Sequence, residues 1–172
     1  LRPGQPVSIP DNEHRDPFRE SAPRAWVQKT EVDSWVINHD YRFQWFLAYK
    51  KITGATNERT LISTILPYCS MTDTVHLILL SDQHVASDTI LLESNLNSYM
   101  IDFIARFKVG TSINFYALNQ LPILNRFRFN EFREFILPRA IELNFTSYSL
   151  QSLGFDSGYE GPPFIWDEER RF

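Results

Sequence analysis

The chain has 172 residues, of which 43% are hydrophobic and 15% aromatic, with a formal net charge of -4 and a pI of about 5.6. This apolar content excludes general disorder, and the length allows one domain with a packed core, alone or with appended arms. Proteins dedicated to nucleic acids are usually basic, so the charge argues against DNA contact over the whole surface but allows a local basic strip.

The cysteine count and the apolar runs bear on cellular location. The single Cys69 cannot form an internal disulfide, and neither a signal peptide nor a membrane-spanning run of roughly 20 apolar residues is visible. We therefore expect a cytoplasmic protein with no membrane partner. The chain begins at Leu1 rather than Met, and the segment from Asp167 to Glu169 has the acidic composition of a helix start, so we expect a fragment of a longer protein.

Three segments of the chain differ in composition. Residues 1–24 are rich in proline and charge, which predicts an extended N-terminal arm or linker. Residues 25–124 carry the patterns of a mixed domain of strands and helices, and residues 125–172 predict a helical segment and a connector, truncated at a helix start. There is no internal repeat.

Three stretches of the central domain predict strands. Tyr41–Ile52 places aromatic residues on one side, Thr60–Leu66 is rich in β-branched residues, and Val75–Leu80 is a short apolar run. The first two are joined by a turn-rich connection, which predicts an antiparallel hairpin.

The most regular local pattern follows these strands. Apolar residues recur at three- and four-residue steps and predict an amphipathic helix over Asn95–Lys108 that packs across the sheet; they are Leu96, Met100, Phe103, Ile104 and Phe107. Ser94 or Asn95 is expected to cap this helix, and Gly110 to end it in a left-handed conformation. Alternation over Ser112–Leu118 predicts a further strand. The expected fold is α+β, with a mixed, largely antiparallel sheet and packed helices.

The last part of the chain contains a second helical pattern. Apolar residues between Phe132 and Leu143 have helical spacing, and Pro138 is expected to kink or restart that helix. For its phenylalanines, core packing is favoured over a base-stacking surface.

Several kinds of catalytic motif are absent from the sequence. The four histidines (His14, His39, His76 and His84) have no metal-ligand spacing with Cys69. There is no GxSxG nucleophile elbow, no Walker loop and no GxGxxG fingerprint. We therefore do not expect catalysis or a bound cofactor in this chain; a nuclease would need clustered carboxylates around a metal ion.

Two groups of polar residues are candidates for DNA contact. In the first, Arg59, helped by Lys50 and Lys51, would point to a phosphate or a base edge. The alternative is that Asn57 supplies a turn and Glu58 pairs with Arg59 or a neighbour to close the hairpin.

The second group lies around Gly110. Lys108, Thr111 and Asn114 flank this glycine and would approach a DNA backbone. The alternative is that cations in a last helical turn merely meet the negative end of the helix dipole. Farther on, Arg126 and Arg128 alternate with phenylalanines and would line an exposed face.

Four blocks of the sequence together resemble a known family: RFQWFLAYKKITGATNERTLISTILP, NLNSYMIDFIARFKVGTSINFYALNQLPIL, FILPRAIELNFTSYSL and GPPFIWDEERRF. In this order they are similar to the C-terminal, target-recognition part of large adenine-specific DNA methyltransferases from type II restriction-modification and phage-defence systems. The chain departs from that family at Gly110-Thr111, where related proteins often carry two glycines.

The resemblance implies that the chain recognises and positions double-stranded DNA. Its partners would be the DNA and the catalytic methyltransferase domain of the same parent chain. The family's [DNS]PP[YFW] tetrapeptide and glycine-rich cofactor loop are absent, so methyl transfer and S-adenosylmethionine binding would belong to that catalytic domain.

A protein-interaction module is the alternative function. It would brace the methyltransferase or bind another defence subunit, as the acidic pI allows. A contiguous positive groove would favour DNA, whereas an exposed apolar patch would favour a protein partner.

Overall fold

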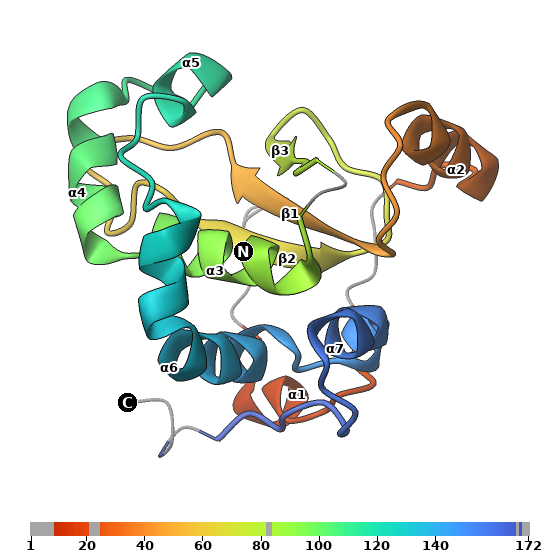
Figure 1. The fold of residues 1–172 in the computed structure, drawn as a ribbon. Helices are drawn as coiled ribbons and strands as arrows, with labels where there is room; N and C mark the ends of the chain where they lie inside the picture. Colours follow the sequence, from red (N-terminus) through yellow and green to blue (C-terminus); the bar gives the residue numbers. More distant parts are fainter. Residues whose placement is uncertain (1–8, 21–24, 82–83, 168, 170–172) are drawn as a thin grey trace.

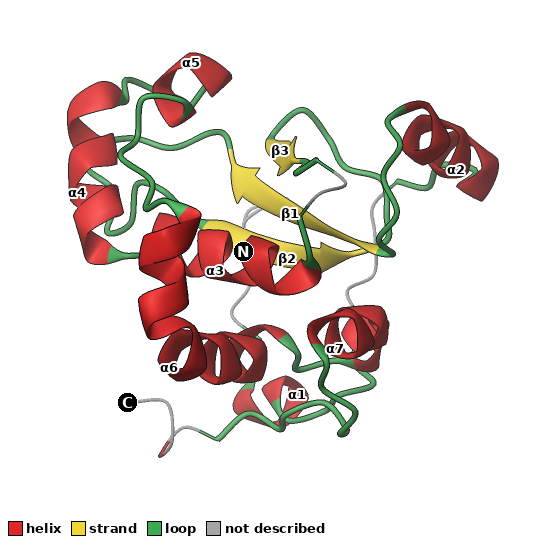
Figure 2. Cartoon of the chain, in the orientation of Figure 1, coloured by secondary structure: helices red, strands yellow, loops and turns green. Residues whose placement is uncertain are grey.

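The computed structural model describes residues 9–20, 25–81, 84–167 and 169 of the chain (Figure 1). The predicted α+β class is confirmed, because helices surround an antiparallel three-stranded sheet (Figure 2). The helices are α1 (Asp11–His14), α2 (Lys29–Asn38), α3 (Ala86–Leu96), α4 (Tyr99–Lys108), α5 (Phe115–Leu118), α6 (Arg126–Asn144) and α7 (Gln151–Ser157), with a 3-10 turn η1 at Tyr148–Leu150. In the described part of the chain, no helix has the length and apolar content needed to cross a membrane.

The sheet is built around β1 (Trp45–Lys50), which lies between β2 (Ser63–Pro67) and β3 (Val75–Ile78). Both neighbours pair with β1 in antiparallel register. This arrangement confirms the predicted hairpin and the third strand, with shorter bounds than the sequence indicated.

Both faces of β1 are buried, which explains its almost unbroken apolar sequence. Trp45, Leu47 and Tyr49 belong to the main core, and Trp45 also donates from Nε1 to Asp156 at 2.8 Å. On the opposite face, Phe46 contacts the ring of Trp35 from α2. Helix α3 lies across the sheet, α6 and α7 pack against α3, and α4 and α5 lie at one end (Figure 1).

One core includes residues from both predicted parts of the chain, 25–124 and 125–172. Ala140, Ile141 and Phe145 of the second part join the β1 residues in it, and Gly154 allows close packing because a Cβ there would lie 2.8 Å from the Phe145 ring. The described N-terminal residues lie against the C-terminal part, since the Tyr148 N–H donates to Pro17 O at 3.0 Å. The proposed domain boundaries remain predictions.

The predicted single helix over Asn95–Lys108 is wrong, because α3 ends at Leu96 and α4 begins at Tyr99. The break occurs where the Asn97 side chain turns to β2: it accepts from Ser63 N and donates to Ser63 O, both at 2.9 Å. The cap of α4 is Ser98, whose hydroxyl accepts from Ile101 N, rather than Ser94 or Asn95.

The predicted strand over Ser112–Leu118 is also wrong. A single bridge pairs Ser112 with Ile52, and α5 follows at once. Asn114 explains the change, because its side chain accepts from Ala117 N at 2.9 Å and so caps α5. Gly110 is not left-handed; among the described glycines, only Gly158 has a positive φ, of 83°.

Helix α6 carries Pro138 in its interior, and Figure 1 shows its two halves running in different directions, as expected for a proline inside a helix. The predicted helix start near Asp167 falls largely outside the described residues, although Asp167 Oδ1 accepts from Glu169 N at 3.1 Å.

Candidate nucleic-acid interface

Two segments carrying predicted DNA contacts lie side by side at the end of β1. Ile113 N donates to Lys51 O at 2.9 Å, and Thr53 N donates to Thr111 O at 3.2 Å. The chain therefore brings Lys50 and Lys51 next to the segment of Thr111 and Asn114, although more than 50 residues separate them in sequence. Lys108, at the end of α4, immediately precedes this segment.

The side chains at this end of the sheet differ in whether they already form hydrogen bonds or ion pairs within the protein. Lys50 is exposed, and no described residue forms a hydrogen bond or ion pair with its ammonium group. Lys51 pairs with exposed Asp73 at 2.7 Å, and Lys108 donates to Gln120 Oε1 at 2.9 Å. Such exposed contacts are weak, so a phosphate could replace them.

Asn114 is half engaged. Its Oδ1 is used by the α5 cap, which leaves the Nδ2 group as a donor toward solvent. We call this end of the sheet the lysine end and define it by Lys50, Lys51, Lys108, Thr111 and Asn114; the side chains of Lys50 and Lys51 leave the extended backbone on opposite faces.

A row of contacting side chains that was not predicted from the sequence lies next to the lysine end. The buried Tyr49 hydroxyl lies 3.0 Å from His76 Nδ1, and the His76 ring stacks on Phe115 with 4.8 Å between centroids. His76 Nε2 lies 3.6 Å from Asp73. The hydrogen bond from Lys51, followed by the charge of Lys51, lowers the pKa of Asp73, and burial raises the pKa of Tyr49. The alternation of the strands put Tyr49 and His76 on one face, but nothing in the sequence indicated their pairing.

Arg59 lies at the other end of α4 from Lys108, and its side chain is partly buried, with 29% exposed. Its guanidinium donates to Asn97 O, covers the Tyr99 ring at 5.1 Å and has Nε 3.6 Å from Asp102. Its loop contains the turn predicted for Asn57, whose N–H donates to Gly54 O at 3.1 Å. These contacts favour a structural role for Arg59 over contact with DNA.

Asp102 of α4 fixes the same loop. This buried carboxylate accepts from Thr60 N at 2.7 Å and from Leu61 N at 2.8 Å, and it pairs with Arg106 at 3.0 Å. Burial alone would raise the pKa of Asp102, but the two backbone donors, Arg106 and the charge of Arg59 together lower it. Arg106 also donates to the carbonyls of Ala55 and Glu58.

The two remaining candidates lie at the start of α6 and have acidic partners. Arg126 pairs with the buried Asp88 of α3 at 3.2 Å, and Arg128 pairs with Glu131 at 3.0 Å. Asp88 is also 3.6 Å from Arg133, so this ion-pair group ties α6 to α3.

The face of α4 that the apolar spacing predicted for the core is largely exposed. Of the five residues predicted for it, Met100 (67%), Phe103 (58%) and Phe107 (76%) are exposed, whereas Leu96 is buried and Ile104 packs against the core. Together with the neighbouring Tyr99 (83%), the three exposed residues form what we call the α4 aromatic face. The inner side of α4 instead buries Ile101, Asp102 and Ala105. The core prediction for α6 also fails at Phe132 and Phe135, which are 53% and 62% exposed.

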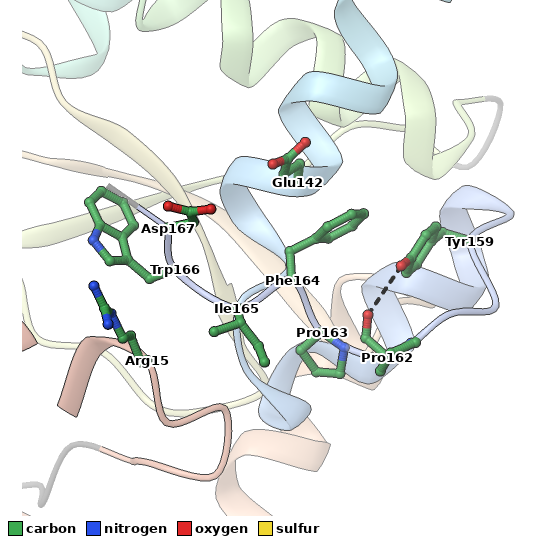
Figure 3. Close-up of a pocket in the computed structure, with 9 residues that line it drawn as sticks. All are labelled: Arg15, Glu142, Tyr159, Pro162, Pro163, Phe164, Ile165, Trp166 and Asp167. Atoms are coloured by element: carbon green, nitrogen blue, oxygen red, sulfur yellow. Dashed lines mark hydrogen bonds between the residues drawn. The ribbon is translucent and has the colours of Figure 1, made fainter. Parts of the chain in front are cut away.

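A hollow of about 620 Å³ lies between the N-terminal segment, α6 and the C-terminal stretch (Figure 3). Arg15, Glu142 and Asp167 bring charges of both signs to it, beside the Trp166 ring. The described residues contain no group of His, Cys, Asp or Glu that could hold a metal ion. We assign no chemistry to this hollow.

Comparison with family models, with curated proteins and with solved structures gives no match for this chain.

Proposed function

We propose that the chain is the target-recognition region of an adenine-specific DNA methyltransferase of the restriction-modification type. It holds double-stranded DNA against the catalytic domain of the same parent chain and is not itself catalytic. The sequence resemblance supports this proposal, and one structural observation carries it: the pairing of residues 51–53 with residues 111–113 gathers the lysine end from separate segments.

Each member of the lysine end has a chemical part in this proposal. The ammonium groups of Lys50, Lys51 and Lys108 contact phosphates and set the position of the duplex. Thr111 and the free Nδ2 of Asn114 supply short polar contacts beside them. Arg59 and Arg126 serve the fold that supports this end of the sheet, whereas Arg128, whose pair with Glu131 is exposed, stays a candidate for phosphate contact.

The reaction needs groups that this chain does not supply. S-adenosylmethionine and the methyl transfer belong to the catalytic domain, and the whole enzyme would act in the cytoplasm. The single Cys69, which is exposed, fits that reducing compartment.

Duplex DNA binding, titrated from about 50 to 200 mM salt, tests the proposal. The double variant Lys50→Ala/Lys51→Ala should bind more weakly, and the slope of log affinity against log salt should fall by about two. Lys29→Ala is the matched control, because Lys29 pairs with Asp33 at 2.8 Å much as Lys51 pairs with Asp73, but it lies on α2. Unchanged affinity and slope in the double variant would contradict the assignment of the lysine end.

The α4 aromatic face favours a second candidate function, that of a protein-interaction module. In that case the variant Phe103→Ser/Phe107→Ser would lose binding to a separately expressed catalytic domain while its DNA affinity stayed the same. Loss of DNA binding alone would point back to recognition.

A further inference from the structure

Among the described residues, the outer edge of the sheet at β3 has backbone groups without a pairing strand. Within the described chain the strand order is β2-β1-β3, so no strand pairs with β3 on the side away from β1. Lys51 N donates to Thr74 O, and in the antiparallel register this places His76 and Ile78 in the pairs whose backbone groups face β1. The N–H and C=O of Leu77 therefore point outward.

An apolar cavity of about 410 Å³ lies directly beside this edge. Val75 and Leu77 line it from β3 itself, because side chains two residues apart share a face of a strand. Trp35 of α2, Phe46 of β1 and Met71 of the preceding loop complete most of its wall.

The rim of the cavity carries a negative charge. Glu31 of α2 is exposed and lines the rim, and its carboxylate has no hydrogen-bond or ion-pair partner among the described residues. By contrast, neighbouring Asp33 is occupied by Lys29 and by the Tyr68 hydroxyl. Glu31 is thus available to a cation that approaches the edge.

We propose that β3 and this cavity form a docking site for an extended peptide that adds to the sheet as an antiparallel strand. The peptide residue opposite Leu77 exchanges backbone hydrogen bonds with it and places an apolar side chain in the cavity. A Lys or Arg of the peptide lies near Glu31. The site adjoins the lysine end, because Val75 of its wall is the register partner of Lys50, but it does not depend on the proposed DNA contact.

The register predicts which peptide amides matter. In an antiparallel pair, a residue opposite Leu77 has its side chain on the same face as Leu77, toward the cavity, and its N–H toward β3. The N–H groups of the alternate peptide residues face solvent. N-methylation at the apolar positions should therefore block docking, whereas N-methylation at the alternate positions should not.

The test uses the whole chain and short peptides that alternate Thr with one apolar residue (Leu, Val or Phe) and carry Lys at both ends. Binding is followed by NMR, through chemical shifts and through amide exchange at Leu77. We expect saturable binding and a protected Leu77 amide. N-methylation at the apolar positions should weaken binding at least about tenfold, and N-methylation at Thr should change it by less than about twofold.

Charge reversal provides the protein-side test. Glu31→Lys should weaken binding of the cationic peptides, while Glu134→Lys, the same change at an exposed site on α6, should not. Three outcomes overturn the proposal: no binding by any of the peptides, equal effects of the two N-methylation patterns, or protection of Leu77 that grows with protein concentration alone. The last would show that the edge pairs with a second copy of the chain.

Discussion

Glu93 of α3 lies against Asn144 of α6 in the protein interior, and the Asn144 side chain donates to Glu93 Oε2 at 3.2 Å. Asn97 donates to the other carboxylate oxygen. Glu93 is only 7% exposed, and burial raises its pKa to about 7, although the hydrogen bonds from Asn144 and Asn97 oppose this. A group that changes charge near neutral pH thus lies between two packed helices.

The first prediction concerns the pH dependence of stability. Because the folded pKa of Glu93 lies above the ordinary value of 4.5, its contribution is complete below that value and is lost as the pH rises through about 7. The loss amounts to about 3 kcal/mol in the free energy of unfolding. Glu93→Gln should remove this part of the dependence in urea denaturation between about pH 5 and pH 8. Glu131→Gln, at an exposed site, is the control, and equal slopes for wild type and Glu93→Gln would refute the prediction.

The second prediction concerns Asp102. Asp102→Asn removes the negative charge that faces Arg59 and Arg106, and it replaces one acceptor oxygen by an amide donor. We expect a loss of about 3 kcal/mol in the free energy of unfolding, measured by urea denaturation. Asp73→Asn, which removes an exposed partner of Lys51, should cause no measurable loss. A similar result for both variants would mean that the Asp102 contacts do not hold the loop.

The third prediction rests on the proposed DNA contact. Asp73 competes with phosphate for Lys51, so Asp73→Asn should tighten duplex binding and steepen its salt dependence. The slope should increase by up to about one. Asp33→Asn, which frees Lys29 in the same way on α2, should leave DNA binding unchanged. Weaker binding by Asp73→Asn would count against phosphate contact at Lys51.

The fourth prediction separates the two sides of α4. Phe103→Ser/Phe107→Ser should change the free energy of unfolding by less than about 1 kcal/mol, because both rings are mostly exposed. Ile101→Ala should cost about 2–5 kcal/mol, because Ile101 is 2% exposed. Thermal and urea denaturation measure both. The reverse order of effects would place the aromatic side of α4 in the core.

Sequence patterns were sufficient for the hairpin of β1 and β2, because both segments are rich in aromatic or β-branched residues and their connection contains a turn. They failed for α3, whose buried surface includes Ser87, Asp88, Thr89 and Glu93 and therefore has no amphipathic pattern. Those polar groups are acceptable inside because partners elsewhere in the chain satisfy several of them, such as Arg126 and Arg133 at Asp88. Such long-range pairs leave no local signal.

The prediction of which side of α4 faces the core was wrong for a related reason. Apolar spacing shows which residues share a face, but it does not show which face meets the rest of the protein. Here the backbone N–H groups of Thr60 and Leu61 need an acceptor, and Asp102 supplies it from the inner side of the helix. The prediction of the candidate site was affected in the same way. The sequence suggested that Arg59 is free to contact DNA, but in the fold its side chain lies beside Asp102 and Tyr99.

The bonds from Asp102 and Arg106 to the loop over residues 55–61 have a mechanical consequence. They join α4 to the loop of the β1–β2 hairpin, with the α4 aromatic face on the outside and Lys108 at the C-terminal end of the helix. A partner bound to that face would therefore lie at a defined distance from Lys108, because both are on the same helix. If the lysine end contacts DNA as proposed, the position of the partner along α4 would then also set the position of the duplex.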